Sequence, residues 1–382
     1  MRTLHPDRLK QNLEERILRD VANGHIGGAS VVVCQEGAVV YTHCFGAFTP
    51  NESRPLTGDA IFRLASMTKP VTAVATMLMV ERGLFRLTDP VEAYLPQFQH
   101  MSVATHDAEG RVVKSEPCRT KITLLHLLTH TSGIGSGRCA EIYIPRMTDE
   151  DIRTLSGSVD YYSRIPLSFE PFTTSEYSGR AAFDVLTAII EQVTQEDYNT
   201  FLRREIFEPC EMQDASFVPS AAQWARMVTM HARVDGKSGI GSTVPGCVFE
   251  QIPCTHYLGG AGLISTLDDY ANFAEMLLNK GSFKGNRVLD PASVEILSTP
   301  HTTAAIQPGN QRWGLGVRVI VDDSYAYLPV GTYGWSGAYG SHFWVDPVNR
   351  ITAVYMKNSR YDGGSGAQTA FHFEEDVYRA LQ

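Results

Sequence analysis

The chain has 382 residues, of which 43% are hydrophobic and 20% charged, the balance of an ordinary soluble globular protein. Its formal net charge is −9 and it carries no block of basic residues, so neither nucleic acid nor an anionic membrane is an expected partner. The seven cysteines are scattered, odd in number and without a C-x-x-C pair. Reduced thiols in a cytoplasmic protein therefore fit better than a disulfide framework or a zinc cluster.

The N-terminal segment, residues 1–24, is predicted to form a charged amphipathic helix. Its apolar positions recur at helical spacing: Leu9, Leu13, Ile17 and Val21. The segment lacks the apolar stretch of a signal peptide. Nowhere in the chain do 18 apolar residues follow one another, so we expect no membrane span.

Both ends of the chain have sequence patterns typical of β-strands. Residues 28–35 and 38–48 are rich in Val, Tyr and Phe and are joined through Glu36-Gly37, a hairpin pattern. The C-terminal part contains further short β-like runs, at 312–321, 326–334, 341–347 and 350–359, and ends in a helix-like segment near 367–381.

The middle of the chain has helical periodicity, clearest at 67–82, 122–129, 179–194, 197–207 and 266–279. We therefore predict an α+β fold, in which both chain ends build an antiparallel sheet flanked by helices and a mostly helical lobe is inserted between them. The whole chain, 1–382, would be one catalytic unit. Its α/β lobe would span about 1–65 and 310–382, and its helical lobe about 66–309.

Ser66 and Lys69 lie three residues apart in "FRLASMTKPVTA", residues 62–73. Positions three apart share one face of a helix, so the Lys69 amine can lie beside the Ser66 hydroxyl and serve it as a base. The alternative is a helix-capping serine followed by a surface lysine. Pro70 also disfavours helical geometry at Lys69. Local pattern alone leaves the two interpretations about equal.

Two further segments carry candidate chemistry. Tyr177 precedes Ser178-Gly179 and an amphipathic helix; it is either part of a polar capping turn or a phenol that accepts a proton beside the Lys69 ammonium. Residues 333–347, "YGWSGAYGSHFWVDP", form either a glycine-rich hairpin turn or a strand edge that offers backbone N–H groups to a substrate.

Other signals are weaker. "GWSGA" comes close to a G-x-S-x-G nucleophile elbow, but Ala338 replaces the last glycine and the context is strand–turn–strand. His126 and His130 have the i, i+4 spacing of two metal ligands, but no third ligand is evident, so helix-end hydrogen bonding is favoured. Loop 135–146 is a candidate lining of the cleft. Four large side chains are expected to fill the core: Met77, Leu78, Trp224 and Phe273.

These pieces, in this order, resemble the serine β-lactamase/penicillin-binding-protein superfamily, in particular its class C-like branch and the family VIII carboxylesterases. The segments 62–98, 122–134 and 257–281 match as well, and the resemblance covers about residues 10–380. It implies a β-lactamase/transpeptidase-like fold.

The resemblance also implies roles for individual residues. Ser66 is the nucleophile, Lys69 its proton-accepting neighbour and Tyr177 the partner base and acid. The backbone N–H groups of Ser66 and Ala338 form the oxyanion hole, and three residues contact the substrate: Trp335, Ser336 and Gly337. An amine–phenol pair can activate a serine without histidine, and each oxyanion donor is typically worth about 3–4 kcal/mol.

Three departures from the family pattern matter. No asparagine stands two residues after Tyr177, Trp335 occupies the place of the lysine in Lys-Thr-Gly, and Phe172 stands where glycine is common. Without that lysine the site lacks a point charge for a substrate carboxylate, whereas an indole favours uncharged esters.

We therefore expect a cofactor-free, metal-free serine hydrolase that cleaves small or short-acyl carboxylic esters through an acyl-enzyme on Ser66. The same machinery in a β-lactamase, a D-amino-acid amidase or peptidase, or an acyltransferase is the alternative. A catalytically idle binding or scaffold protein is the alternative from another class. The expected partner is a small-molecule ester, and a homo-oligomer is left open.

Overall fold

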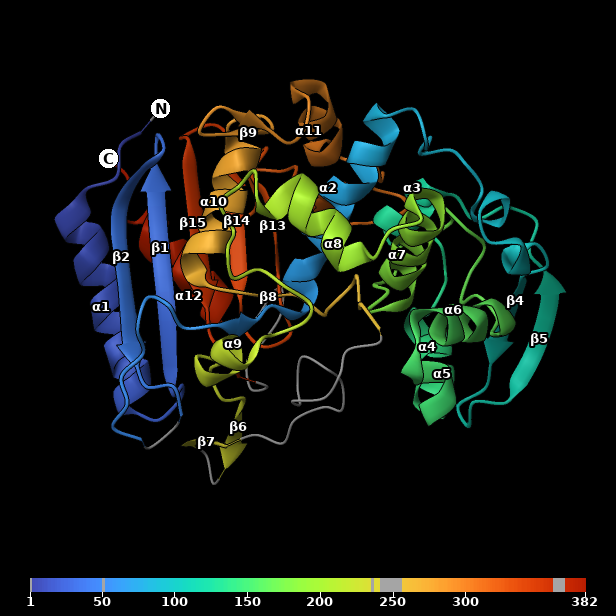
Figure 1. Ribbon diagram of the computed structural model, residues 1–382, viewed down its shortest axis with the longest axis horizontal. Helices are drawn as coiled ribbons and strands as arrows, with labels where there is room; N and C mark the ends of the chain where they lie inside the picture. The colour runs from blue at the N-terminus through green and yellow to red at the C-terminus, as the bar shows by residue number, and fades with distance from the viewer. Residues whose placement is uncertain (1, 50–51, 235–236, 241–255, 360–367) are drawn as a thin grey trace.

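The computed structural model describes all residues except 1, 50–51, 235–236, 241–255 and 360–367 (Figure 1). Its main sheet has seven strands in the order β11-β12-β13-β14-β15-β1-β2, and each neighbouring pair is antiparallel. The strands are β1 (Gly28–Gln35), β2 (Ala38–Gly46), β11 (Gln311–Trp313), β12 (Arg318–Ile320), β13 (Tyr333–Ser336), β14 (His342–Asp346) and β15 (Ile351–Met356). The two chain ends therefore build one sheet, as predicted.

The chain ends meet where β1 pairs with β15 and Val32 lies opposite Val354. The β1–β2 hairpin turns through Glu36 and Gly37, which both have positive φ, as a two-residue type I′ turn requires. Every residue of β1 is buried, because both faces of the sheet are covered by helices.

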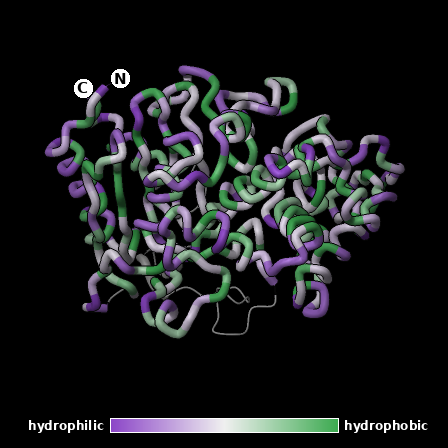
Figure 2. Tube along the Cα trace, turned by 45° about the horizontal axis from the view of Figure 1, so that its top comes forward, coloured by the Kyte–Doolittle hydropathy of each residue, from purple (hydrophilic) through white to green (hydrophobic). Residues whose placement is uncertain are grey.

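Helices α1 (Pro6–Ala22) and α12 (Gln368–Tyr378) cover one face of the sheet, and α10 (Leu267–Leu278) covers the other (Figure 1). Because strand side chains alternate, Val31 and Val33 join the core under α1 and α12, while Val32 joins the core under α10. Hydrophobic stretches of the chain run mainly through the interior of this body, and hydrophilic ones along its outer turns (Figure 2).

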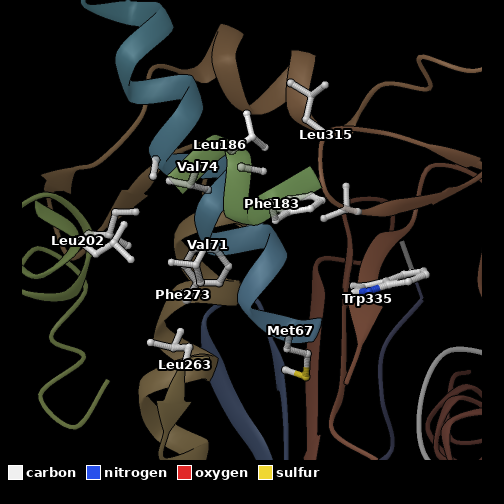
Figure 3. Packing of buried hydrophobic residues seen from close by; sticks show 14 of the residues in the cluster. Met67, Val71, Val74, Phe183, Leu186, Leu202, Leu263, Phe273, Leu315 and Trp335 are labelled. Atoms are coloured by element: carbon white, nitrogen blue, oxygen red, sulfur yellow. The ribbon is translucent and has the colours of Figure 1, made fainter. Parts of the chain in front are cut away.

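Helix α2 (Thr68–Glu81) runs through the centre of the molecule, between the sheet and the helical lobe (Figure 1). Its residues from Thr68 to Met79 are all buried, which explains why its sequence is apolar on every side. Pro70 lies in the first turn, where its missing N–H costs no helical hydrogen bond. Figure 3 shows Val71 of α2 beside Phe273 of α10, with Phe183 of α7 (Ala181–Thr194) on the other side of α2.

The remaining helices are short and lie mostly in the helical lobe. They are α3 (Leu124–Leu128), α4 (Gly137–Tyr143), α5 (Asp149–Arg153), α6 (Leu155–Arg164), α8 (Tyr198–Leu202), α9 (Ala221–Ala225) and α11 (Pro291–Ser298). The small two-stranded sheets are β3 (Phe62–Arg63) with β8 (Ile264–Ser265), β4 (Ser102–His106) with β5 (Val112–Pro117), β6 (His231–Val234) with β7 (Lys237–Ile240), and β9 (Ser282–Phe283) with β10 (Asn286–Arg287).

Some local predictions were wrong. Residues 326–332 are not a strand, because Pro329 lacks an N–H donor and Gly331 bends the chain with a φ of 89°. The helix predicted at 197–207 is present, but it consists of α8 followed by a π-helical turn, Arg203–Phe207. Trp224 is only half-buried, whereas Met77, Leu78 and Phe273 are in the core.

The lobe boundaries near 65/66 and 309/310 stay a prediction. Helix α10 lies within the range expected for the helical lobe but packs on the sheet, so the sheet body draws on the middle of the chain too. In the part of the chain that the structure describes, no helix combines the length and apolarity needed to cross a bilayer.

Candidate active site

Ser66 lies in a 3-10 turn, Ala65–Met67, between β3 and α2. Ala65 has a φ of 46°, a conformation that is strained for a residue other than glycine and that is concentrated at functional sites. The Thr68 hydroxyl holds this turn: it donates to the Ala65 carbonyl at 2.7 Å and accepts from the Leu263 N–H at 3.1 Å. The N-cap of α2 is Met67, without a side-chain bond, so the capping interpretation of Ser66 was wrong.

Lys69 is fully buried. Its Nζ donates to Ser66 Oγ at 3.2 Å and to the carbonyl oxygens of Gly179 and Gly260, each at 2.7 Å. These three acceptors match the three N–H donors of an ammonium. The interpretation of Lys69 as a surface lysine was therefore wrong, and its amine is held against the Ser66 hydroxyl.

Tyr177 lies on the segment that leads into α7, with its ring centroid 4.9 Å from Lys69 Nζ. Its side chain is 39% exposed, so the phenol is open to solvent at the site. Trp335 Nε1 donates to the Tyr177 hydroxyl oxygen at 3.3 Å. The next residue, Ser178, accepts from the Ala182 N–H at 3.1 Å and thereby caps the start of α7. The capping interpretation therefore applies to Ser178, whereas the role of Tyr177 as a proton acceptor stays a prediction.

Strand β13 reaches the same place from the sheet. A Cβ on Gly337 would lie 2.2 Å from the Leu64 carbonyl oxygen, so only glycine allows this close approach two residues before Ser66. Ala338 follows in an exposed turn. Among the described residues, neither the Ser66 N–H nor the Ala338 N–H donates to any acceptor. These two N–H groups therefore remain candidates for the oxyanion hole, which stays a prediction.

The Ser336 side chain points away from this site. Successive side chains of a strand alternate, and the Ser336 hydroxyl lies 2.6 Å from His342 Nδ1 in the interior. His342 Nε2 lies 2.9 Å from Glu374 Oε1, which completes a serine–histidine–carboxylate chain. Ser336 is only 2% exposed, however, so this hydroxyl cannot meet a substrate and the nucleophile-elbow alternative fails. Only the backbone of Ser336 can contact a substrate.

Glu374 also bonds to Arg318 and accepts from the Tyr325 hydroxyl at 2.8 Å. Burial alone would raise the pKa of Glu374, but the Arg318 charge and the hydrogen bonds from His342 and Tyr325 lower it to about 2. This buried network ties β12, β13 and β14 to α12 beneath the site, and sequence reasoning did not find it.

His126 and His130 serve two different turns. His126 Nδ1 accepts from the Thr123 N–H at 3.2 Å and completes a capping box on α3, so helix-end hydrogen bonding is confirmed for it. His130 Nδ1 accepts from the Ser178 N–H at 3.1 Å, beside Tyr177. The described residues contain no cluster of three or more metal-ligating side chains.

One aromatic residue beside Tyr177 and Trp335 was not found from the sequence, and the structure also accounts for Phe172, which the sequence had marked as a departure from the family pattern. Trp313 of β11 lies 4.7 Å from Trp335 and 6.1 Å from Tyr177, measured between ring centroids, and these rings form an apolar wall. Phe172, where relatives commonly have glycine, has a φ of 65° and stacks on His126. The left-handed backbone there explains the family's preference for glycine.

Loop 135–146 approaches the segment that carries Tyr177. Gly137, at the start of α4, lies so close to Glu176 that a Cβ there would come within 1.7 Å of Glu176 Oε2. A role of this loop in setting substrate size stays a prediction.

Comparison with known proteins places these features in a family. The family model described as Beta-lactamase matches residues 13–373. The chain is 31% identical over 376 residues to Esterase EstB of Burkholderia gladioli, which covers 90% of this chain and 88% of that protein. It is also 31% identical over 361 residues to Protein Rv1367c of Mycobacterium tuberculosis, covering 89% and 88%.

Among solved structures, "EstCE1, a hydrolase with promiscuous acyltransferase activity" aligns with a TM-score of 0.81 at 25% identity, over 98% of this chain and 99% of that chain. The fold is therefore β-lactamase/transpeptidase-like, as the resemblance implied. With a family model that spans nearly the whole chain, this protein belongs to the beta-lactamase family of serine hydrolases.

Proposed function

We propose that the protein is a serine carboxylesterase of the family VIII type, which cleaves small or short-acyl esters through a covalent acyl-enzyme on Ser66. The observation that carries this proposal is the 3.2 Å hydrogen bond from buried Lys69 Nζ to Ser66 Oγ, with the Tyr177 phenol beside it. The similarity to EstB, which is named an esterase, supports the same reaction class.

In the proposed mechanism the Lys69/Tyr177 pair enters the step one proton short, as ammonium with phenolate or as amine with phenol. Ser66 Oγ attacks the ester carbonyl carbon while its proton passes to that vacant position on the pair. The carbonyl oxygen becomes an oxyanion, which the Ser66 and Ala338 N–H groups stabilise. The C–O bond to the alcohol breaks, and the pair returns the proton to the leaving oxygen. Water then attacks the acyl-enzyme through the same proton transfers and releases the carboxylic acid.

The proposal that the substrate is an ester follows from the aromatic residues that surround Tyr177. Trp335 lies where relatives carry a lysine, and with Trp313 and Tyr177 it offers aromatic surface instead of a cation. A substrate carboxylate would have no ammonium partner at this position, so β-lactams and peptide C-termini lose the interaction that an uncharged ester does not need. The β-lactamase and amidase alternatives are therefore disfavoured.

Acyl transfer to an alcohol is the second candidate, favoured by the similarity to EstCE1, whose description includes acyltransferase activity. It needs no new residue, because an alcohol can replace water in the second half of the reaction. The idle-scaffold alternative is disfavoured by the contact that brings Ser66, Lys69 and Tyr177 together.

The location is proposed to be the cytoplasm. Among the described residues five cysteines are free thiols: Cys34, Cys44, Cys118, Cys139 and Cys210. Cys247 and Cys254 lie outside the described residues. Cell fractionation with an antibody against the native protein tests this location directly.

The deciding experiment compares the wild type with Ser66→Ala on p-nitrophenyl acetate, butyrate and octanoate, and on nitrocefin. We expect turnover of the shorter esters, little nitrocefin hydrolysis, and loss of esterase activity by orders of magnitude in the variant. Unchanged turnover in Ser66→Ala would sink the assignment. Product analysis with and without added alcohol distinguishes hydrolysis from transfer.

A further inference from the structure

His130 binds the segment around Tyr177 from both sides. Its carbonyl oxygen accepts from the Glu176 N–H at 3.1 Å and from the Ser175 hydroxyl at 3.3 Å. Its ring Nδ1 accepts from the Ser178 N–H at 3.1 Å. The residues immediately before and after Tyr177 are thus both fixed to one histidine, which sequence analysis had assigned only to a helix end.

The His130 ring also fixes the plane of the Tyr177 ring. The two ring centroids are 4.5 Å apart, and on its other sides the imidazole contacts Trp313 at 4.4 Å and Phe183 at 5.5 Å. Tyr177 is itself 39% exposed, so this cluster of rings supports its buried side. A phenol held in this way keeps one orientation toward Lys69.

His130 is also connected to Lys69 through two adjacent residues of the chain. Ser178, whose N–H donates to His130 Nδ1, is followed by Gly179, whose carbonyl oxygen accepts from Lys69 Nζ at 2.7 Å. The segment that His130 holds therefore supplies both the phenol and one of the acceptors that orient the amine.

His130 is kept in this place at an energetic cost. Its φ of 55° is left-handed, and its buried Nε2 has no hydrogen-bond partner among the described residues. Because Nδ1 is an acceptor, the proton of the neutral ring is on Nε2. Burial, and then the Lys69 charge, lower the pKa of His130 well below its ordinary value. Unpaired buried polar groups are rare in folded proteins and call for an explanation.

We propose that His130 is the positioning residue of the acylation step: as a neutral imidazole it holds Tyr177 and the Gly179 carbonyl in the geometry that the Lys69/Tyr177 pair needs. The inference rests on the proposed function. It assigns no proton transfer to His130, which acts through the residues that it orients.

Two substitutions separate the parts of this role. His130→Phe keeps a ring in the stack but removes the acceptor for the Ser178 N–H. His130→Asn keeps an acceptor close to the position of Nδ1 and tolerates the left-handed backbone. The matched controls are His126→Phe and His126→Asn, because His126 is also a mostly buried histidine whose Nδ1 accepts a backbone N–H, but on α3.

We expect kcat on p-nitrophenyl butyrate to fall about tenfold or more in His130→Phe, with KM changed less than about threefold, because only proton transfer is misaligned. His130→Asn should recover part of kcat, and the rate at which a fluorophosphonate labels Ser66 should follow kcat in both variants. The His126 variants should lower thermal stability comparably and leave kcat within about twofold.

All rates are measured below the lowest unfolding temperature of the set and divided by the folded fraction from circular dichroism. Wild-type kcat in His130→Phe overturns the proposal, as does an equal loss of kcat in the His126 variants or a loss confined to KM. If His130→Phe does not fold, His130→Asn decides: kcat below that of both His126 variants, with KM retained, supports the role, and unchanged kcat refutes it. Ser66→Ala runs alongside, since retained turnover there would instead refute the proposed function.

Discussion

The indole N–H of Trp335 donates to the hydroxyl oxygen of Tyr177 across a distance of 3.3 Å. The residue that replaces the family's lysine thus still gives a hydrogen bond to the tyrosine, but without a positive charge. The oxygen that accepts this bond has a further lone pair with which it can accept a proton. Trp335 therefore joins two properties of the site, an aromatic substrate wall and a neutral donor to the proposed base.

Trp335→Phe removes this donor and retains most of the ring. A hydrogen bond to a charged group is worth about 1.5–3 kcal/mol, so without it the phenolate form of Tyr177 that accepts the Ser66 proton is less populated. We therefore expect kcat/KM for p-nitrophenyl butyrate to fall by at least about tenfold. Steady-state kinetics test this, with Trp313→Phe as the control. The Trp313 ring lies in the same wall but contacts Tyr177 through its ring only, whereas Trp335 donates a hydrogen bond to it. Equal effects of the two substitutions would show that the ring contact matters and the N–H does not.

Lys69→Met should abolish acylation and destabilise the fold. The substitution keeps an unbranched side chain but leaves the carbonyl oxygens of Gly179 and Gly260 without their donor. We expect the loss of stability to be about 1–3 kcal/mol and the loss of kcat to be several orders of magnitude. Urea unfolding and single-turnover kinetics measure the two effects. The control is Lys121→Met, at an exposed lysine paired with Glu92. It should change neither the free energy of unfolding nor kcat much.

Gly337→Ala should impair both folding and catalysis. The added methyl would lie 2.2 Å from the Leu64 carbonyl oxygen and from Ser341 Oγ, so β13 must move away from the turn that carries Ser66. Overpacking of this kind costs about 1–3 kcal/mol, and any such shift moves the Ala338 N–H away from the oxyanion. Thermal unfolding and ester kinetics test it. At Gly58, where a Cβ meets nothing within 4 Å, the same substitution should be neutral, and a neutral Gly337→Ala would contradict the close approach.

The buried network beneath the site predicts the response to acid. The folded-state pKa of Glu374, about 2, lies below its ordinary value. The stability that the ionised Glu374 gives the folded state is therefore fully present above about pH 4.5 and is lost as pH falls toward 2. Burial also lowers the pKa of His342. The stability that the neutral His342 ring gives the folded state is therefore lost as pH falls below about 6.5. Stability measured by urea unfolding should therefore decrease from pH 7 to pH 3.

Glu374→Gln tests the origin of this acid response. It leaves the buried Arg318 charge without its carboxylate, so the free energy of unfolding at pH 7 should fall by about 3–5 kcal/mol. The decrease in the free energy of unfolding between about pH 4.5 and pH 3 should be smaller in this variant than in the wild type. Glu116→Gln, at an exposed carboxylate, is the control. An unaltered pH slope in Glu374→Gln would assign the acid sensitivity to other groups.

The sequence by itself determined the features that depend on neighbours along the chain. The β1–β2 hairpin, with its Glu36-Gly37 turn, follows from strand alternation and a turn dipeptide. The adjacency of Ser66 and Lys69 follows from helical spacing, and the buried course of α2 follows from its unbroken apolar composition. These are short-range consequences of backbone geometry, and they predicted the turn that carries the proposed nucleophile Ser66 and the strands at both ends of the chain.

Only the tertiary structure decided which distant groups surround that pair. The acceptors of Lys69 come from Gly179 and Gly260, 110 and 191 positions away, and His130 reaches Ser178 across 48 positions. Whether Ser336 faces the cleft or the interior depended on the pleat of β13 within the assembled sheet. Such contacts arise when packed elements bring remote segments together, and no local pattern specifies them. The sequence therefore predicted the candidate catalytic residues, and only the fold showed which groups hold them in place.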